Sequence, residues 1–264
     1  MDKIVLHLAS LGETQESTIA QTLVEGLRDA LRDRVTLVDA GSTTIAQLRR
    51  QHPDLIHIIG LGGLATRQLM ARAGKLRIPY VVTPLSTLQP WTHVRHPHFP
   101  PTTILVASSH IEHEQLAKLY PQNPLRHIAN PVVTADTSFD EYARHMQEVY
   151  TEALRIHDAA VCDDIARHIS KLGEEDVAIS DILQQVLYIR YQHHRRHITQ
   201  SSLDRLATTM ITTNYDEALM ADRLNELQLT TFFAQLETFL AEHSTLTEGF
   251  MPIPSQPNKT FTLS

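Results

Sequence analysis

Two short histidine clusters are the first residues in this chain whose type and spacing fit metal chemistry. Residues 93–98 hold three histidines in a proline-flanked loop, and residues 193–197 hold three on a predicted helix. Imidazoles at such spacing can bind zinc or copper. The first cluster has no carboxylate or cysteine beside it, and a proline-rich loop is a poor rigid platform. We expect no metal at either cluster, and we interpret the second as a solvated helix end or a surface for an acidic partner.

Nucleophilic and acid–base chemistry find no support in the sequence. Cys162 is the one cysteine, which excludes an internal disulfide and a multi-cysteine zinc site. The adjacent Asp163 and Asp164 disfavour its thiolate. The glycines of residues 60–63, followed by Arg67, are the best candidate for a phosphate-binding turn. We favour a tight strand-to-helix turn with positive φ there, and we expect no catalytic residue and no cofactor.

The overall composition fits a soluble, folded protein. Of the 264 residues, 42% are hydrophobic and 20% are charged, and the net charge is −7. This balance gives no general attraction to nucleic acid or to an anionic membrane. No apolar run is long enough to span a membrane, and the first residues do not resemble a signal peptide. We therefore expect a cytoplasmic protein without a nucleic-acid partner.

The first half of the chain alternates short apolar runs with helical periodicity. The expected strands are residues 4–8, 35–38, 55–59, 80–82, 104–106 and 126–129. The expected helices between them are residues 19–31, 44–50, 64–75 and 111–119, the last with a capping box at Ser109 and Glu112. Continuously apolar strands joined by helices predict a Rossmann-like, doubly wound parallel sheet of the α/β class.

The second half has a different character. Residues 1–135 hold 13 Lys and Arg against 10 Asp and Glu, whereas the remainder holds 10 against 20. Seven of the 9 glycines also fall in the first part. A breaker-poor stretch with helical periodicity predicts successive helices, an all-α module that follows the sheet. We divide the chain into a sheet domain (1–135), a crossover helix packing back on it (136–157), a helical module (158–251) and an extended, partly disordered tail (252–264).

Ligands of a doubly wound sheet bind at the carboxyl ends of its strands. Small and polar residues follow the expected strands, and we assign them to ligand contact instead of proton transfer. These cleft residues are Ser10, Gly12, Gly60, Gly62, Gly63, Ser86, Thr87, Trp91, Ser108 and Ser109.

The segment from His52 to Trp91 resembles the acceptor-side, amino-terminal domain of GT-B glycosyltransferases of family four. Asp54, His57, Gly60 and Leu61 match the family's D-x-x-H-x-H-G-L-W strand end, and residues 78–82, Pro84, Leu88, Pro90 and Trp91 match its G-I-P-Y-V-V-S-P-H-G-M-L-x-P-W segment. Residues 128–131 resemble its I-P-N-P turn, and residues 138–154 its last helix. The resemblance implies a Rossmann-like fold whose cleft receives a saccharide, with the loop of residues 93–98 over that cleft.

Departures from the family are as informative as the matches. The family's second domain binds the nucleotide sugar through two glutamates at i and i+8, and no such glutamate pair exists in this chain. The family's histidine in S-P-H-G is Leu85 here, and leucine can neither carry a proton nor accept a hydrogen bond.

Three interpretations remain open. The favoured one is a non-catalytic saccharide-binding or regulatory protein that retains the acceptor half, with a saccharide or a glycosyltransferase as partner. The second is an active retaining glycosyltransferase that a partner or second subunit completes. The third is a scaffold that acts through its helical half, where we place a homo-oligomer contact.

Overall fold

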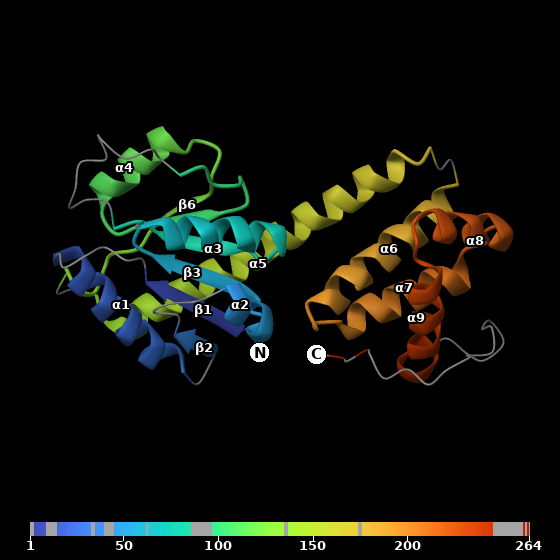
Figure 1. Ribbon diagram of the computed structural model, residues 1–264, viewed down its shortest axis with the longest axis horizontal. Coiled ribbons are helices and arrows are strands. Elements are labelled where there is room, and N and C mark those ends of the chain that lie inside the picture. The colour runs from blue at the N-terminus through green and yellow to red at the C-terminus, as the bar shows by residue number, and fades with distance from the viewer. Residues whose placement is uncertain are drawn as a thin grey trace. The chain divides into compact units, whose positions relative to one another are not determined.

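The computed structural model describes residues 3–8, 15–32, 35–39, 45–61, 63–85, 97–134, 137–173, 176–244, 261 and 263. The chain divides into two compact units, residues 1–158 and residues 159–264. The first unit carries the sheet, and the second is helical where it is described (Figure 1).

The first unit is built on a six-stranded sheet with the order β2-β1-β3-β4-β5-β6. Its strands are β1 (Lys3–Leu8), β2 (Thr36–Asp39), β3 (Leu55–Ile59), β4 (Tyr80–Thr83), β5 (Ile104–Ala107) and β6 (Leu125–His127). Every ladder between them is parallel. The strand order reverses between β1 and β3, which is the switch point of a doubly wound sheet. All six expected strands are present, although the last covers Leu125–His127 instead of residues 126–129.

Helices cover both faces of this sheet (Figure 1). They are α1 (Gln15–Leu31), α2 (Ile45–Gln51), α3 (Gly63–Lys75), α4 (His110–Leu119) and the first part of α5 (Phe139–Ser170). One apolar core joins α1 and α5 to the sheet through residues such as Leu27, Met146 and Ile4. The other joins α2, α3 and α4 to the opposite face through residues such as Leu69 and Ile56. The expected α/β, Rossmann-like architecture followed by helices is confirmed.

Helix α5 is longer than the sequence analysis expected. It was predicted to cover residues 138–154 and to lie before a boundary at 157, but it continues to Ser170. No glycine or proline interrupts it, and Val161, Ile165 and Ile169 continue a buried stripe at i, i+4 spacing. These later residues belong to the core of the second unit, since that unit begins at Ala159.

The described residues of the second unit form four further helices, as the breaker-poor sequence predicts. They are α6 (Val177–His194), α7 (Gln200–Thr212), α8 (Glu217–Glu226) and α9 (Thr230–His243). Asp176 and Asp216 cap α6 and α8, because each side chain accepts hydrogen bonds from two backbone N–H groups of the first turn. The helices share one apolar core that also includes Phe261. The expected tail at 252–264 lies outside the described residues, except for Phe261, which is buried, and Leu263.

No helix in the described parts of the chain is long and apolar enough to cross a membrane. This finding agrees with the absence of a long apolar run in the sequence.

A close approach between α1 and α5 gives the first testable prediction. A Cβ atom built on Gly26 would lie 2.2 Å from a ring carbon of Phe139. Gly26→Ala should therefore force the ring out of its site and lower the free energy of unfolding by about 1–3 kcal/mol. Urea denaturation measures this change.

Gly74 in α3 provides the matched control, because a Cβ atom there would meet nothing within 4 Å. Gly74→Ala should raise the free energy of unfolding by roughly 0.5–1 kcal/mol through helix propensity alone. Equal effects of the two substitutions would contradict the proposed packing of α1 on α5.

Candidate functional site

The structure describes only part of the predicted cleft. Gly60 and Gly63 follow β3, and Ser108 and Ser109 follow β5, so these four lie at the carboxyl edge of the sheet as expected for strand-end residues. The remaining predicted cleft residues lie outside the described residues: Ser10, Gly12, Gly62, Ser86, Thr87 and Trp91. The site is therefore built from the ends of β3, β4, β5 and β6.

The backbone is in the left-handed region at two neighbouring strand ends. Gly60 has φ 82°, which confirms the tight turn with positive φ after β3. Its N–H donates to the carbonyl oxygen of Thr83 at 2.8 Å, which ties this turn to the end of β4. Leu85, two residues after Thr83, has φ 56° and is buried. A leucine in this region carries backbone strain, which folded proteins retain mainly near functional loops.

A capping box fixes the turn between β5 and α4. The Ser109 hydroxyl accepts from the Glu112 N–H at 3.2 Å, and the Glu112 carboxylate accepts from the Ser108 N–H at 2.6 Å. The predicted box is confirmed, with the carboxylate reaching the residue before the cap. Because the Ser109 oxygen serves as an acceptor, its own O–H can still donate to a ligand.

Three histidines gather at the same edge of the sheet, and we call His110, His113 and His127 the imidazole cluster. The ring of His127 lies 4.1 Å from that of His110 and 6.4 Å from that of His113, measured between centroids. Burial lowers the pKa of His127, and the nearby imidazoles lower it further, whereas Glu112 raises it. The cluster thus presents imidazole nitrogens and ring faces beside the two serines.

The imidazole cluster was not found from the sequence, because no local motif contains it. His110 and His113 lie in the first turn of α4, whereas His127 ends β6. The parallel register that pairs Ala107 with His127 brings the end of β6 beside the end of β5. The cluster therefore depends on the pairing of β5 with β6, which a search for local sequence motifs does not detect.

Below this edge lies a buried chain of polar side chains. The two ring nitrogens of His57 lie 2.8 Å from the hydroxyl of Tyr150 on α5 and 2.8 Å from the hydroxyl of Thr83 on β4. Both His57 and Thr83 have no exposed surface. Burial lowers the pKa of His57 to about 3 and raises the pKa of Tyr150. His57 is thus a neutral, structural residue and does not line the cleft.

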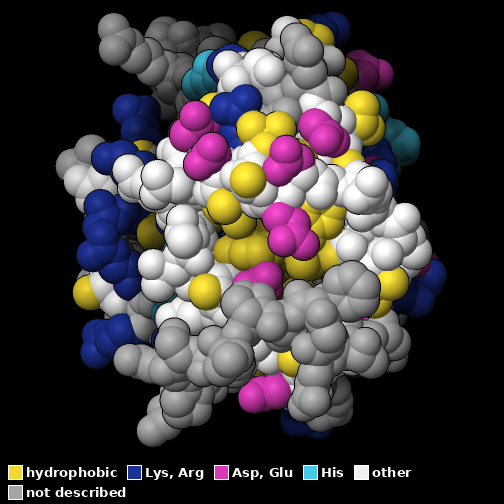
Figure 2. All heavy atoms as spheres, turned by 90° about the vertical axis from the view of Figure 1, so that its right-hand side faces the viewer, with side chains coloured by type: hydrophobic (Ala, Val, Ile, Leu, Met, Phe, Trp, Pro, Cys, Tyr) yellow, Lys and Arg dark blue, Asp and Glu magenta, His cyan; other side chains and the backbone are white. Residues whose placement is uncertain are grey.

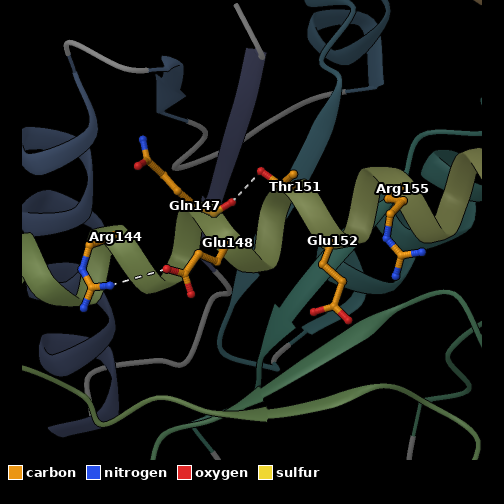
Figure 3. A pocket seen from close by; sticks show the side chains of 6 residues that line it. All are labelled: Arg144, Gln147, Glu148, Thr151, Glu152 and Arg155. Carbon is orange, nitrogen blue, oxygen red and sulfur yellow. Dashed lines mark hydrogen bonds and ion pairs between the residues drawn. The ribbon is translucent and has the colours of Figure 1, made fainter.

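A shallow hollow of about 550 Å³ lies on the outer face of α5 (Figure 3). Three of its charged side chains form ion pairs, since Arg144 pairs with Glu148 at 3.5 Å and Glu152 pairs with Arg126. The Thr151 hydroxyl donates to the Gln147 carbonyl oxygen at 2.9 Å, as Figure 3 shows. With balanced charge and occupied hydrogen-bonding groups, this hollow is a weak candidate for a ligand site.

The histidines of residues 93–98 and 193–197 do not form a site in the described part of the chain. His93 and His96 lie outside the described residues, and His98 is exposed. At the end of α6, His194 is exposed as expected for a solvated helix end, whereas the ring of His193 stacks on Phe261 with 4.5 Å between centroids. Over the described ranges, no group of three or more His, Cys, Asp or Glu side chains is arranged to hold a metal ion. Cys162 is exposed on α5.

Glu237 on α9 is a further residue that the sequence did not single out. It is 9% exposed, and burial raises the pKa of its carboxyl to about 7. Burial raises the pKa of Tyr215, and the carboxylates of Glu217 and Glu237 raise it further. Figure 2 shows the side of the molecule where α8 and α9 lie, and apolar side chains gather there among Asp and Glu side chains.

A scan against protein-family models and a search of curated proteins both find no match to this chain. The site must therefore be interpreted from its own geometry.

The buried His57 generates a pH prediction. Because its folded pKa of about 3 lies below the ordinary 6.5, the unfolded chain takes up a proton that the folded chain refuses as the pH falls. This group therefore lowers the free energy of unfolding by about 1.4 kcal/mol per pH unit between roughly pH 6 and 4.

His57→Gln removes this titration while keeping a polar side chain. At pH 7.5 the variant should be about 1–3 kcal/mol less stable than the parent, since two buried hydroxyls lose their partner. The difference should shrink steadily toward pH 4.5 in urea denaturation. A difference that does not change with pH would show that His57 is not buried and neutral.

Glu237 should give the opposite dependence on pH. Its folded pKa of about 7 lies above the ordinary value, so ionisation at higher pH opposes folding. Glu237→Gln should raise the free energy of unfolding at pH 8 by about 1–2 kcal/mol and change it little at pH 5. Glu242→Gln, an exposed site on the same helix, serves as the control and should have no effect at either pH.

Proposed function

We propose that the first unit is a non-catalytic saccharide-binding domain that receives its ligand at the carboxyl edge of the sheet. The observation that carries this proposal is the imidazole cluster, which lies with Ser108 and Ser109 at the carboxyl ends of β5 and β6. Ligands of a doubly wound sheet bind at this edge, and the cluster lies along it from the switch point between β1 and β3.

Saccharide is the ligand class that suits these groups. A neutral imidazole offers one donor and one acceptor nitrogen, and a serine hydroxyl offers both functions, so together they match the hydroxyls of a sugar. The exposed ring faces of histidine also provide a flat surface for the apolar face of a sugar ring. The resemblance to the acceptor domain of family-four glycosyltransferases favours the same ligand class.

Two features argue against glycosyl transfer by this unit alone. Leu85 stands where the family has a histidine, and its side chain is buried in the core beneath the edge. His57, the matching histidine of the strand, is held neutral between two hydroxyls and has no exposed surface. Neither residue can exchange a proton with a ligand at neutral pH.

The role that follows is regulatory. A saccharide bound at this edge would signal the supply of an acceptor to a glycosyltransferase partner or a saccharide pathway, with the protein acting in the cytoplasm. The helical unit would then provide the contact to the partner or to a second copy.

Saccharide titration tests the proposal. Glucose, galactose, mannose, N-acetylglucosamine and their β-linked disaccharides should raise the melting temperature of the protein for at least one member of the panel. His110→Ala/His127→Ala should weaken that binding by about tenfold or more, because two side-chain contacts are lost.

His168→Ala is the matched control, since His168 is an exposed histidine in the later part of α5. It should leave saccharide binding unchanged. A response to UDP-, GDP- or ADP-sugars with no response to free saccharides would contradict the proposal and favour an enzyme completed by a partner. An unchanged melting temperature with every saccharide and nucleotide sugar tested would also contradict the proposal.

A further inference from the structure

Aromatic rings in the second unit enclose the last described part of the chain. Phe261 is 8% exposed and lies 4.5 Å from His193, 5.4 Å from Phe232 and 5.2 Å from Phe239, measured between ring centroids. His193 belongs to α6, and the two phenylalanines lie seven residues apart on α9, so they share one side of that helix. We call His193, Phe232 and Phe239 the aromatic face.

The residue two positions later is held through its backbone. Leu263 forms a parallel β-bridge with Ile198, which lies between α6 and α7. The carboxyl-terminal end of the chain accordingly lies beside the carboxyl end of α6 (Figure 1). Leu263 keeps 37% of its surface exposed, whereas Ile198 is fully buried. An aromatic side chain and a short β-pairing thus hold the end of the chain on the helices.

We propose that the aromatic face is a peptide-docking site, and that its resident ligand is this chain's own carboxyl-terminal segment. The site accepts in its place an extended partner segment of the same chemistry, an aromatic residue followed two positions later by an aliphatic one. This assignment concerns the second unit and does not depend on saccharide binding by the first.

The chemistry of recognition follows from the two kinds of contact. Backbone pairing with Ile198 is available to any extended segment, whereas the ring contacts select an aromatic side chain. In an extended segment, residues two apart lie on the same side of the chain, so an aromatic and an aliphatic residue at that spacing can both be held.

Phe261 belongs to the apolar core of the second unit and is joined covalently to α9, so a partner segment must displace it in order to bind. Sixteen residues of sequence separate Ser244 from Phe261. A segment tethered in this way acts at an effective concentration of the order of millimolar. A free peptide must exceed that concentration to bind the full chain, so the site becomes measurable once the resident segment is removed.

Fluorescence anisotropy tests the proposal with a labelled peptide of residues 257–264. It should bind a chain that ends at Asn258, and should bind the full chain at least about tenfold more weakly. The same peptide should bind full-length Phe261→Ser about as well as it binds the shortened chain. A peptide with serine at both Phe261 and Leu263 should not bind.

Two protein controls distinguish the aromatic face from nonspecific binding. Phe239→Ala in the shortened chain should abolish peptide binding, because it removes one of the rings that contact Phe261. Ile211→Ala, at an exposed apolar residue of α7, should leave peptide binding unchanged.

The remaining outcomes overturn the proposal. A folded shortened chain that binds no peptide would show that Phe261 has no separable docking site. Loss of cooperative unfolding in both the shortened chain and Phe261→Ser would identify Phe261 as an obligatory core residue. A full-length dimer that dissociates on removal of the tail, seen by light scattering, would assign the aromatic face to a second copy of this chain.

Discussion

The hydrogen-bonded chain from Thr83 through His57 to Tyr150 is the interaction on which the first unit depends. A doubly wound sheet must bury both faces, and α5 covers the face on which His57 lies. A buried polar side chain in the centre of a parallel sheet is costly unless its hydrogen-bonding groups are satisfied. Hydroxyls from β4 and α5 engage both imidazole nitrogens, and they therefore fix α5 at one position along the strands. The turn at Gly60 joins this frame, because its N–H donates to the carbonyl oxygen of Thr83.

This arrangement separates the enclosed histidine of the sheet from the histidines that we propose bind a saccharide. His57 is neutral, enclosed and fully hydrogen-bonded, whereas His110 and His127 are exposed at the edge of the same sheet. His57 thus contributes to the fold from inside the sheet. The exposed histidines lie two and three strands away, at the ends of β5 and β6.

Much of the fold could be predicted from the sequence, because the strands are short apolar runs between glycines, prolines and polar turns. The expected range 55–59 matches β3, and the second unit is helical where it is described, as its lack of helix-breaking residues predicts. The end of α5 was not predicted correctly. The resemblance suggested an end at residue 154, but no glycine or proline ends the helix before Ser170. The predicted range of the edge strand β6 was shifted along the sequence, because Arg126 and His127 are exposed and carry no apolar pattern.

The candidate site could not be predicted to the same degree. His57 and Tyr150 lie 93 positions apart, and the imidazole cluster depends on the register of β5 with β6.

The most direct test of the account observes the histidine side chains themselves. Long-range ¹H–¹⁵N spectra of the imidazole groups, recorded during titration with free saccharides, report on each ring separately. The account predicts that the resonances of His110, His113 and His127 shift together and saturably with a saccharide, while those of His57 stay unchanged. Shifts at His57, or a response confined to nucleotide sugars, would contradict it.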